Sequence, residues 1–264
     1  MSAIYHFSGA GNDFVVIDGR EGDVSAFREV PRIEALCREH KTDGLMILGS
    51  GEASVDFTME FYNPDGSGGM MCGNGGRCIV AFADSLGIKP TSGNVFLFRA
   101  PDGLHTGEIL ARPEDGLWEV RIKMIDVQGI TPMLGGYFLN TGTRHFVKFV
   151  DDVEKVDIDT EGKALRWNEA FAPVGTNVNF VHVAPDGLHV RTFEKGVEGE
   201  TLACGTGLTA CALVAHHAGV PTATPGAYRL RARQDWLSVN FTPGADEKFT
   251  DVYLTGPARL VEIL

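Results

Sequence analysis

The sequence predicts an α+β protein of two pseudo-symmetric halves, each a curved mixed or antiparallel sheet wrapped around one central helix. The motif Cys-Gly-(Asn/Thr)-Gly occurs once in each half of the chain, at residues 72–75 and 204–207. Each copy runs into a short apolar segment that ends at a glycine, Gly87 in the first copy and Gly219 in the second. A helix that is apolar on nearly all sides must be buried on nearly all sides, and a surrounding sheet achieves this.

Composition limits the classes of function. The chain has 264 residues, enough for one large domain or two of ordinary size. Hydrophobic residues make up 44% and charged residues 22%, as is typical of a globular protein. The net charge of −12 repels phosphate backbones, so we expect no nucleic-acid partner and no anionic membrane partner. A small acidic substrate in a locally positive site remains compatible with this charge.

The cysteines and the start of the chain indicate a compartment. The first residues show no basic stretch before an apolar run, and no apolar run approaches the ~18 residues of a membrane span. The five cysteines are Cys37, Cys72, Cys78, Cys204 and Cys211. We therefore expect a cytoplasmic protein with reduced thiols, and no metal site because no pair has a strong zinc spacing.

The first half reads as strands around two helices. A helix is predicted at residues 30–37 from Pro31 in its first turn and an apolar face of Ile33, Leu36 and Cys37. A strand-like segment follows the Gly-x-Gly at residues 9–11, where a dinucleotide site needs a helix, so that reading is disfavoured. Strands are predicted at residues 4–7, 14–17, 45–48, 55–62, 94–99, 104–110 and 117–123.

The second half repeats this plan after a crossover at residues 127–132. A helix-like stretch covers residues 160–170, and Pro-Asp-Gly turns at residues 101–103 and 185–187 predict hairpins that include His105 and His189. We expect domains at residues 1–125 and 126–257. Strands are predicted at residues 137–140, 145–150, 177–183, 188–193, 228–231, 237–241, 251–254 and 258–263.

The two cysteine motifs suggest a specific chemistry. A helix start presents unpaired N–H groups and a positive dipole end, which bind a carboxylate and stabilise a thiolate by about 0.3–1 kcal/mol, up to ~2 when partly buried. If the N-termini of the two predicted helices face one another, an amino acid bound between them has one cysteine sulfur on each face of its Cα. A thiolate then removes the Cα proton and a thiol returns one, which inverts the centre. This chemistry needs no pyridoxal phosphate or other cofactor, and we expect Cys78 and Cys211 to be core residues.

The chain closely resembles the diaminopimelate epimerase family over nearly its whole length. The residues that carry the resemblance are GNDFV at 11–15, YNPDG at 62–66, CGNGGRC at 72–78 and GETLACGTG at 199–207, in this order. The resemblance implies two halves with a cleft between them, usually a homodimer, with residues 258–264 returning to the first half. It implies cofactor-independent epimerisation of LL-2,6-diaminopimelate to meso-diaminopimelate, in lysine and peptidoglycan precursor biosynthesis.

The resemblance also assigns roles to residues. It implies that Cys72 and Cys204 are the catalytic base and acid. The positions that match the family's substrate contacts are Asn12, Asn63, Gly73, Asn74, Asn177, Glu194, Lys195, Gly205 and Thr206. Without the resemblance, Asn12 and Asn63 are equally well explained as turn residues.

Several positions depart from the family pattern. Gly44 stands where the family often has glutamine, Thr143 where it commonly has asparagine, and Lys195 where it commonly has arginine. Arginine can donate two parallel hydrogen bonds to a carboxylate, whereas lysine presents a single point charge. We hypothesise that Arg144 compensates for Lys195. Three alternatives stay open: a racemase of a different amino acid in the same superfamily, a non-enzymatic amino-acid or anion binding protein, and a thiol-redox protein.

Overall fold

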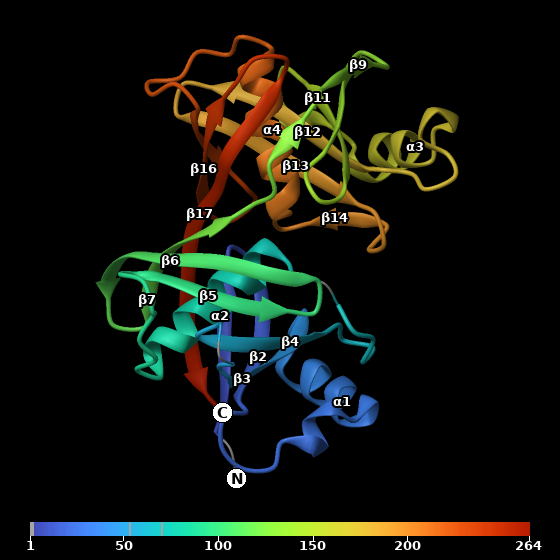
Figure 1. The fold of residues 1–264 in the computed structure, drawn as a ribbon. Coiled ribbons are helices and arrows are strands. Elements are labelled where there is room, and N and C mark those ends of the chain that lie inside the picture. Colours follow the sequence, from blue (N-terminus) through green and yellow to red (C-terminus); the bar gives the residue numbers. More distant parts are fainter. Residues whose placement is uncertain (1–2, 53, 70) are drawn as a thin grey trace. The chain divides into compact units, whose positions relative to one another are not determined.

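The structure is a computed structural model that describes residues 3–52, 54–69 and 71–264. The chain divides into two compact units (Figure 1): unit 1 is residues 1–122 with 256–264, and unit 2 is residues 123–255. Each unit is described by itself below. No helix among the described residues has the length and apolar character required to cross a membrane.

Unit 1 is a ring of strands closed by the end of the chain. Its strands pair in the order β1-β2-β3-β4-β5-β6-β7, and the last part of β17 pairs with both β7 and β1. The parallel pairs are β2–β3 and β4–β5. The strand bounds are β1 Ile4–Gly9, β2 Asn12–Asp18, β3 Gly44–Ser50, β4 Phe57–Tyr62, β5 Val95–Ala100, β6 Gly103–Glu114, β7 Leu117–Lys123 and β17 Lys248–Ile263.

Unit 2 repeats the same series of pairings. β10–β11 is antiparallel, β11–β12 parallel, β12–β13 antiparallel, β13–β15 parallel, and β15–β16 and β16–β17 antiparallel. This series matches β1 to β7 of unit 1 step by step, which confirms the predicted fold of two similar halves. The remaining bounds are β8 Val127–Gln128, β9 Thr131–Met133, β10 Gly136–Asn140, β11 Arg144–Phe149, β12 Asn177–Ala184, β13 Gly187–Glu194, β14 Gly199–Thr201, β15 Ala227–Arg231 and β16 Trp236–Pro243.

One helix lies among the strands of each unit, as Figure 1 shows for α2 and α4. α2 (Gly73–Ser85) is buried from Gly73 to Ala83, and α4 (Gly205–His217) is buried over almost all of its first eleven residues. These segments consist mostly of small and apolar residues, so strands can pack against every side of them. The predicted central helices are confirmed.

Further helices cover the outside of one parallel strand pair in each unit, β2–β3 in unit 1 and β11–β12 in unit 2. α1 (Val30–His40) packs Ile33, Leu36 and Cys37 on side chains of β2 and β3, such as Val15 and Ile47. In unit 2 the corresponding cluster joins Ile158 and Phe171 to Phe146, Val178 and Phe180 of β11 and β12. Strands β2 and β3 are therefore buried on both faces, which explains their nearly continuous apolar runs.

Two predictions give the right kind of element but differ from the structure in where elements begin and end. The predicted helix at residues 160–170 is a π-helical turn at Ile158–Gly162, a short α3 at Lys163–Arg166 and a 3₁₀ turn at Glu169–Phe171. Trp167 and Asn168 end the helix because Asn168 caps the next turn through its side chain, a common competitor of helix continuation. The strands predicted at residues 251–254 and 258–263 are one strand, β17, whose Gly256-Pro257 step pairs with β7.

Candidate active site

The N-terminus of α2 is built around Cys72. This residue is the N-cap, and its Sγ accepts a hydrogen bond from the Gly75 backbone N–H at 3.2 Å. A Cβ added at Gly75 would lie 3.3 Å from the same sulfur. The glycine therefore lets the half-buried sulfur rest over the first turn, where helix N–H groups and the helix dipole favour negative charge.

A hydrogen-bonded row of polar side chains supports this turn. Asn12 donates to Asp43 Oδ2 at 3.1 Å and accepts from Asn74 Nδ2, and Asn74 Oδ1 accepts from Arg77 Nη2 at 2.8 Å. Arg77 also donates to the Gly73 carbonyl at 3.2 Å. The predicted contacts Asn12, Gly73 and Asn74 thus lie together with Cys72 in unit 1. The side-chain amides of Asn12 and Asn74 position one another.

The N-terminus of α4 likewise begins after a cysteine, Cys204, but the Cys204 side chain makes no cap hydrogen bond to the helix. Cys204 is the N-cap and is 8% exposed, and a Cβ added at Gly207 would lie 3.3 Å from its sulfur, as at Gly75. The Cys204 sulfur lies 3.5 Å from Thr206 Oγ1. The backbone of Thr206 is held from outside the helix, because Thr141 Oγ1 donates to its carbonyl at 2.9 Å.

His145 lies next to the first turn of α4 and is fully buried. Asn179 donates from Nδ2 to the Phe146 carbonyl and to His145 Nδ1, both at 3.1 Å, so Nδ1 is an acceptor and Nε2 carries the proton. That proton faces Thr143 Oγ1 and Thr206 Oγ1, each 2.9 Å from Nε2. Burial lowers the pKa of His145 to about 3, so the imidazole is neutral.

Asn177 links this network to the turn after β13. Its Nδ2 donates to Thr143 Oγ1 at 3.2 Å and to the Arg144 carbonyl at 3.0 Å, and its Oδ1 accepts from the Lys195 backbone N–H at 2.8 Å. The hydrogen bonds therefore run from Cys204 through Thr206 and Thr143 to Asn177 and Lys195. Glu194 lies beside them and accepts from Thr201 Oγ1 at 2.9 Å.

The structure places Asn63 apart from these networks. Its backbone and side chain close the turn after β4, with Nδ2 donating to Ser67 Oγ at 3.0 Å. These bonds are those of a turn residue, which was one of the two explanations that the sequence offered.

Two departures from the family pattern have a physical basis. A Cβ at Gly44 would lie 2.7 Å from the Tyr62 carbonyl oxygen, so no side chain fits there unless β4 moves. Arg144 donates to the Phe171 carbonyl at 3.2 Å, and its guanidinium lies 5.1 Å from the Phe138 ring centre. It neighbours the inward His145 in a strand, so it belongs to the outer face. These contacts argue against the hypothesis that it compensates for Lys195.

The other cysteines are core residues, as predicted. Cys78 and Cys211 are fully buried inside α2 and α4, and burial raises the pKa of both thiols well above the usual range. Cys37 is buried under α1, and burial raises its thiol pKa too. A buried neutral thiol is inert as a base.

Sequence reasoning did not select Arg77, His145 or Asn179. Arg77 is a cation inside a segment predicted to be a wholly buried helix, and this conflict was a usable signal. His145 and Asn179 stand in predicted buried strands, where an unexplained polar residue requires hydrogen-bond partners. Which partners they find depends on neighbouring strands and could not be read from the chain.

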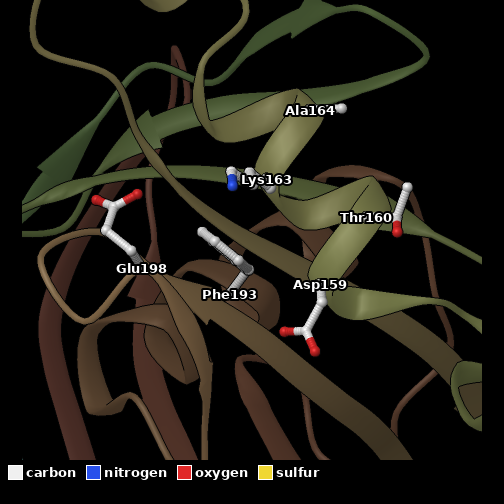
Figure 2. Close-up of a pocket in the computed structure, with 6 residues that line it drawn as sticks. All are labelled: Asp159, Thr160, Lys163, Ala164, Phe193 and Glu198. Carbon is white, nitrogen blue, oxygen red and sulfur yellow. The ribbon is translucent and has the colours of Figure 1, made fainter.

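A cavity of about 540 Å³ lies elsewhere in unit 2, between the π-helical turn with α3 and the end of β13. Figure 2 shows Asp159, Thr160, Lys163, Ala164, Phe193 and Glu198 around it. None of these is a predicted site residue. Within the described ranges, no group of three or more His, Cys, Asp or Glu side chains is arranged to hold a metal ion.

The chain is similar to known proteins in sequence and in fold. The family model described as Diaminopimelate epimerase matches residues 4–111 and 137–261. The diaminopimelate epimerase of Chlorobaculum tepidum is 40% identical, with 96% of this chain and 97% of that protein covered. The one from Aquifex aeolicus is 39% identical, with 96% and 93% covered. A Bacillus anthracis phenazine biosynthesis protein of the PhzF family has the same fold, with a TM-score of 0.77, 12% identity, and 100% and 98% covered.

Proposed function

The chain belongs to the diaminopimelate epimerase family, a family of isomerases, and on that premise we propose that it converts LL-2,6-diaminopimelate into meso-diaminopimelate. The reaction inverts one carbon without a cofactor and serves lysine and peptidoglycan precursor biosynthesis. One observation carries the proposal: each unit caps a buried helix with a cysteine followed by Gly-(Asn/Thr)-Gly.

The proposed chemistry uses the sulfurs of Cys72 and Cys204 as an acid–base pair on opposite faces of the substrate Cα. A thiolate removes the Cα proton and becomes a thiol. The other thiol delivers its proton to the opposite face and becomes a thiolate. One proton leaves and one arrives, so the configuration inverts and the two sulfurs exchange their ionisation states. The reverse reaction uses the same groups in exchanged roles.

The helix starts supply the electrostatic part of the proposal. The first N–H groups of α2 and α4, at Gly73, Asn74, Gly205 and Thr206, are the groups that an α-helix leaves without intrahelical partners. They are proposed to bind the carboxylate next to the reacting carbon, because helix N-termini bind anions. When the Cα proton leaves, negative charge moves onto this carboxylate, where the same donors stabilise it.

The remaining predicted contacts are proposed to hold the rest of the amino acid. They are Asn12 and Asn63 in unit 1, and Asn177, Glu194 and Lys195 in unit 2. The Lys195 backbone N–H donates to Asn177 Oδ1, so the two residues are held next to each other. Lys195 offers one point charge to a distal carboxylate where an arginine would offer a two-point grip.

The two units are proposed to be the two functional halves, each supplying one cysteine. We also propose a homodimer in the cytoplasm, as the family resemblance implies. The proposed partner is a small amino acid, with no nucleic acid and no membrane, which is consistent with the net charge of −12.

Hydrogen exchange at the substrate Cα tests the function. The reduced protein, without added pyridoxal phosphate, is incubated with LL-diaminopimelate in D₂O and followed by proton NMR. We expect loss of the Cα–H signal, because the proton returned by the second thiol comes from solvent. Cys72→Ala and Cys204→Ala should each lower the exchange rate by about 10²–10⁴-fold, the contribution typical of a general acid–base group.

The control is Cys37→Ala, which removes a thiol that lies in the cluster under α1. It should exchange substrate at the wild-type rate. Exchange that survives both Cys72→Ala and Cys204→Ala would refute the two-thiol mechanism. Gly44 and Lys195 favour a racemase of a different amino acid as the second candidate. A panel of amino acids in the same assay separates it, because that protein would exchange another substrate and leave diaminopimelate intact.

A further inference from the structure

Arg77 is the largest fully buried side chain of the described residues, and the proposed mechanism gives it no role. It stands five residues after Cys72, in the second turn of α2. Its guanidinium is charged at all ordinary pH values, and burying an ion costs several kcal/mol unless surrounding groups compensate. Groups around Arg77, which is 0% exposed, must therefore compensate for the cost of burying its charge.

The hydrogen bonds of Arg77 direct its charge toward the turn that carries Cys72. Nη1 donates to the Gly73 carbonyl at 3.2 Å, Nη2 to Asn74 Oδ1 at 2.8 Å, and Nε to the Pro257 carbonyl at 3.3 Å. Gly73 is bonded directly to Cys72, so the guanidinium lies beneath the same turn whose Gly75 N–H donates to the Cys72 sulfur. The charge of Arg77 and the Gly75 N–H donor both favour the thiolate form of Cys72. The low dielectric constant of the buried surroundings strengthens both effects.

Unit 2 places a neutral group at the matching position. Thr209 stands five residues after Cys204, and its Oγ1 donates to the Gly205 carbonyl at 3.0 Å, as Arg77 does to Gly73. The Cys204 sulfur lies 3.5 Å from the Thr206 hydroxyl, behind which stands His145. Burial lowers the pKa of His145, so the ring is neutral, and Asn179 donates to its Nδ1. The backbones at the N-termini of α2 and α4 are thus pseudo-symmetric, but the group beneath the first is a cation and the groups beneath the second are neutral.

We infer that Arg77 is a positioning residue that makes Cys72 the more acidic of the two thiols, so that the resting protein holds a thiolate at Cys72 and a thiol at Cys204. The inference rests on the proposed function only in taking these sulfurs as the acid–base pair. A substrate whose Cα proton faces Cys72 then reacts at once. The opposite configuration first requires a proton to pass from Cys204 to Cys72.

Other charged groups oppose this effect on the unit 1 side. Asp102 accepts from the Met71 N–H at 3.2 Å and contacts His105, and Asp43 accepts from Asn12 and from the Asp13 N–H. Asp43 is exposed, and the side chains of Asp13 and Asp102 are 38% and 21% exposed, so solvent and salt screen all three more than they screen the fully buried Arg77. Near Cys204 the titratable groups are His145, Cys211 and, through Thr201, Glu194.

Alkylation of the substrate-free protein tests the inference. The wild-type chain is treated with iodoacetamide from pH 5 to pH 10, and the labelling rates at Cys72 and Cys204 are resolved by peptide mass spectrometry. The pH at the midpoint of each rate curve gives the thiol pKa whatever the accessibility, because only the thiolate reacts. We expect the Cys72 midpoint to lie at least about one pH unit below that of Cys204.

Variants then identify the cause. Arg77→Met removes the charge and should raise the Cys72 midpoint by about one pH unit, whereas Arg77→Lys keeps the charge and should restore most of the difference. Thr209→Val is the matched control in α4 and should leave the Cys72 midpoint unchanged.

A wild-type Cys204 midpoint at or below that of Cys72 overturns the inference, even if Arg77→Met does not fold. So does a folded Arg77→Met with an unchanged Cys72 midpoint. The assay contains no substrate, so absence of diaminopimelate exchange would count against the function alone.

Discussion

His145 is a residue whose burial has a measurable consequence. Its ring nitrogens contact Asn179, Thr143 and Thr206, and no water is needed to satisfy them. The Asn179 amide donates to Nδ1, so a second proton on the ring would face a donor and would lack an acceptor. Desolvation and this contact both disfavour the charged form.

This residue should make the protein sensitive to mild acid. The unfolded His145 binds a proton below its ordinary pKa of 6.5, whereas the folded one does so only near its lowered pKa of about 3. The unfolded state therefore binds more protons between these values, and stability falls as the pH falls. We expect a slope of up to about 1.4 kcal/mol per pH unit below pH ~6 from this group.

Urea unfolding at several pH values between 4.5 and 7 measures the slope. His145→Gln should be less stable than wild type at pH 7 but should lose less stability on acidification. His40→Gln, at the end of α1, is the control and should follow the wild-type slope. Parallel curves for wild type and His145→Gln would contradict the assignment.

The turn between β13 and β14 carries Lys195 and directly follows Glu194, the last residue of β13. Arg166, at the end of α3, holds it by donating from Nε and Nη2 to Glu198 Oε1 at 3.2 and 3.0 Å. Glu198 adopts a left-handed backbone with φ of 57° and also accepts from the Gly196 N–H. Gly175 makes room for the arginine, because a Cβ there would collide with its Nη1.

Arg166→Lys should therefore weaken substrate binding more than the chemical step. The lysine keeps the charge but cannot make both hydrogen bonds, so the turn loosens. With about 1 kcal/mol lost, we expect KM to rise roughly five-fold while kcat stays within about two-fold. The guanidinium of Arg166 lies 4.2 Å from the Trp167 ring centre. Arg229→Lys is the control, since Arg229 lies 4.0 Å from the Trp236 ring centre in the same way but stands in β15. An unchanged KM in Arg166→Lys would show that this clamp does not position the binding turn.

At the scale of the whole molecule, β17 belongs to both units. Its first part pairs with β16 and β8 in unit 2, and its last part closes the ring of unit 1 between β7 and β1. Ala258 is 0% exposed and is registered with Trp118 of β7. The stability of unit 1 therefore depends on the last residues of the chain.

Ala258→Asp should destabilise unit 1 by roughly 3 kcal/mol or more, because it buries a charge without compensation. Tryptophan fluorescence reports each unit, since Trp118 lies in unit 1 and Trp167 and Trp236 lie in unit 2. In a Trp167→Phe, Trp236→Phe background we expect the urea midpoint of Trp118 to fall by about 1 M or more. The unit 2 reporter, in a Trp118→Phe background, should shift less.

Val261→Asp is the control, because Val261 lies in the same strand and is 47% exposed. It should leave the Trp118 midpoint nearly unchanged. An equally small shift for Ala258→Asp would mean that the last part of β17 does not support unit 1.

The sequence predicted most elements because their signals are local. Pro31 and the spacing of Ile33, Leu36 and Cys37 define α1, and the Cys-Gly turns define the starts of α2 and α4. It failed at residues 160–170, where Asn168 caps a new turn, and at Gly256-Pro257, where a neighbouring strand keeps β17 extended. In both places a side-chain cap or a strand partner overrides the preference of the local residues.

The sequence by itself therefore determined the family, the fold of two similar halves and the two cysteine motifs, since periodicity, turn residues and ordered motifs all lie along the chain. Only the tertiary structure decided which groups stand behind each sulfur. Arg77 reaches Pro257, which is distant in sequence, and His145 reaches Thr206 and Asn179 from a different strand. Such contacts depend on strand pairing and helix placement. For this reason two nearly identical motifs carry different charge environments.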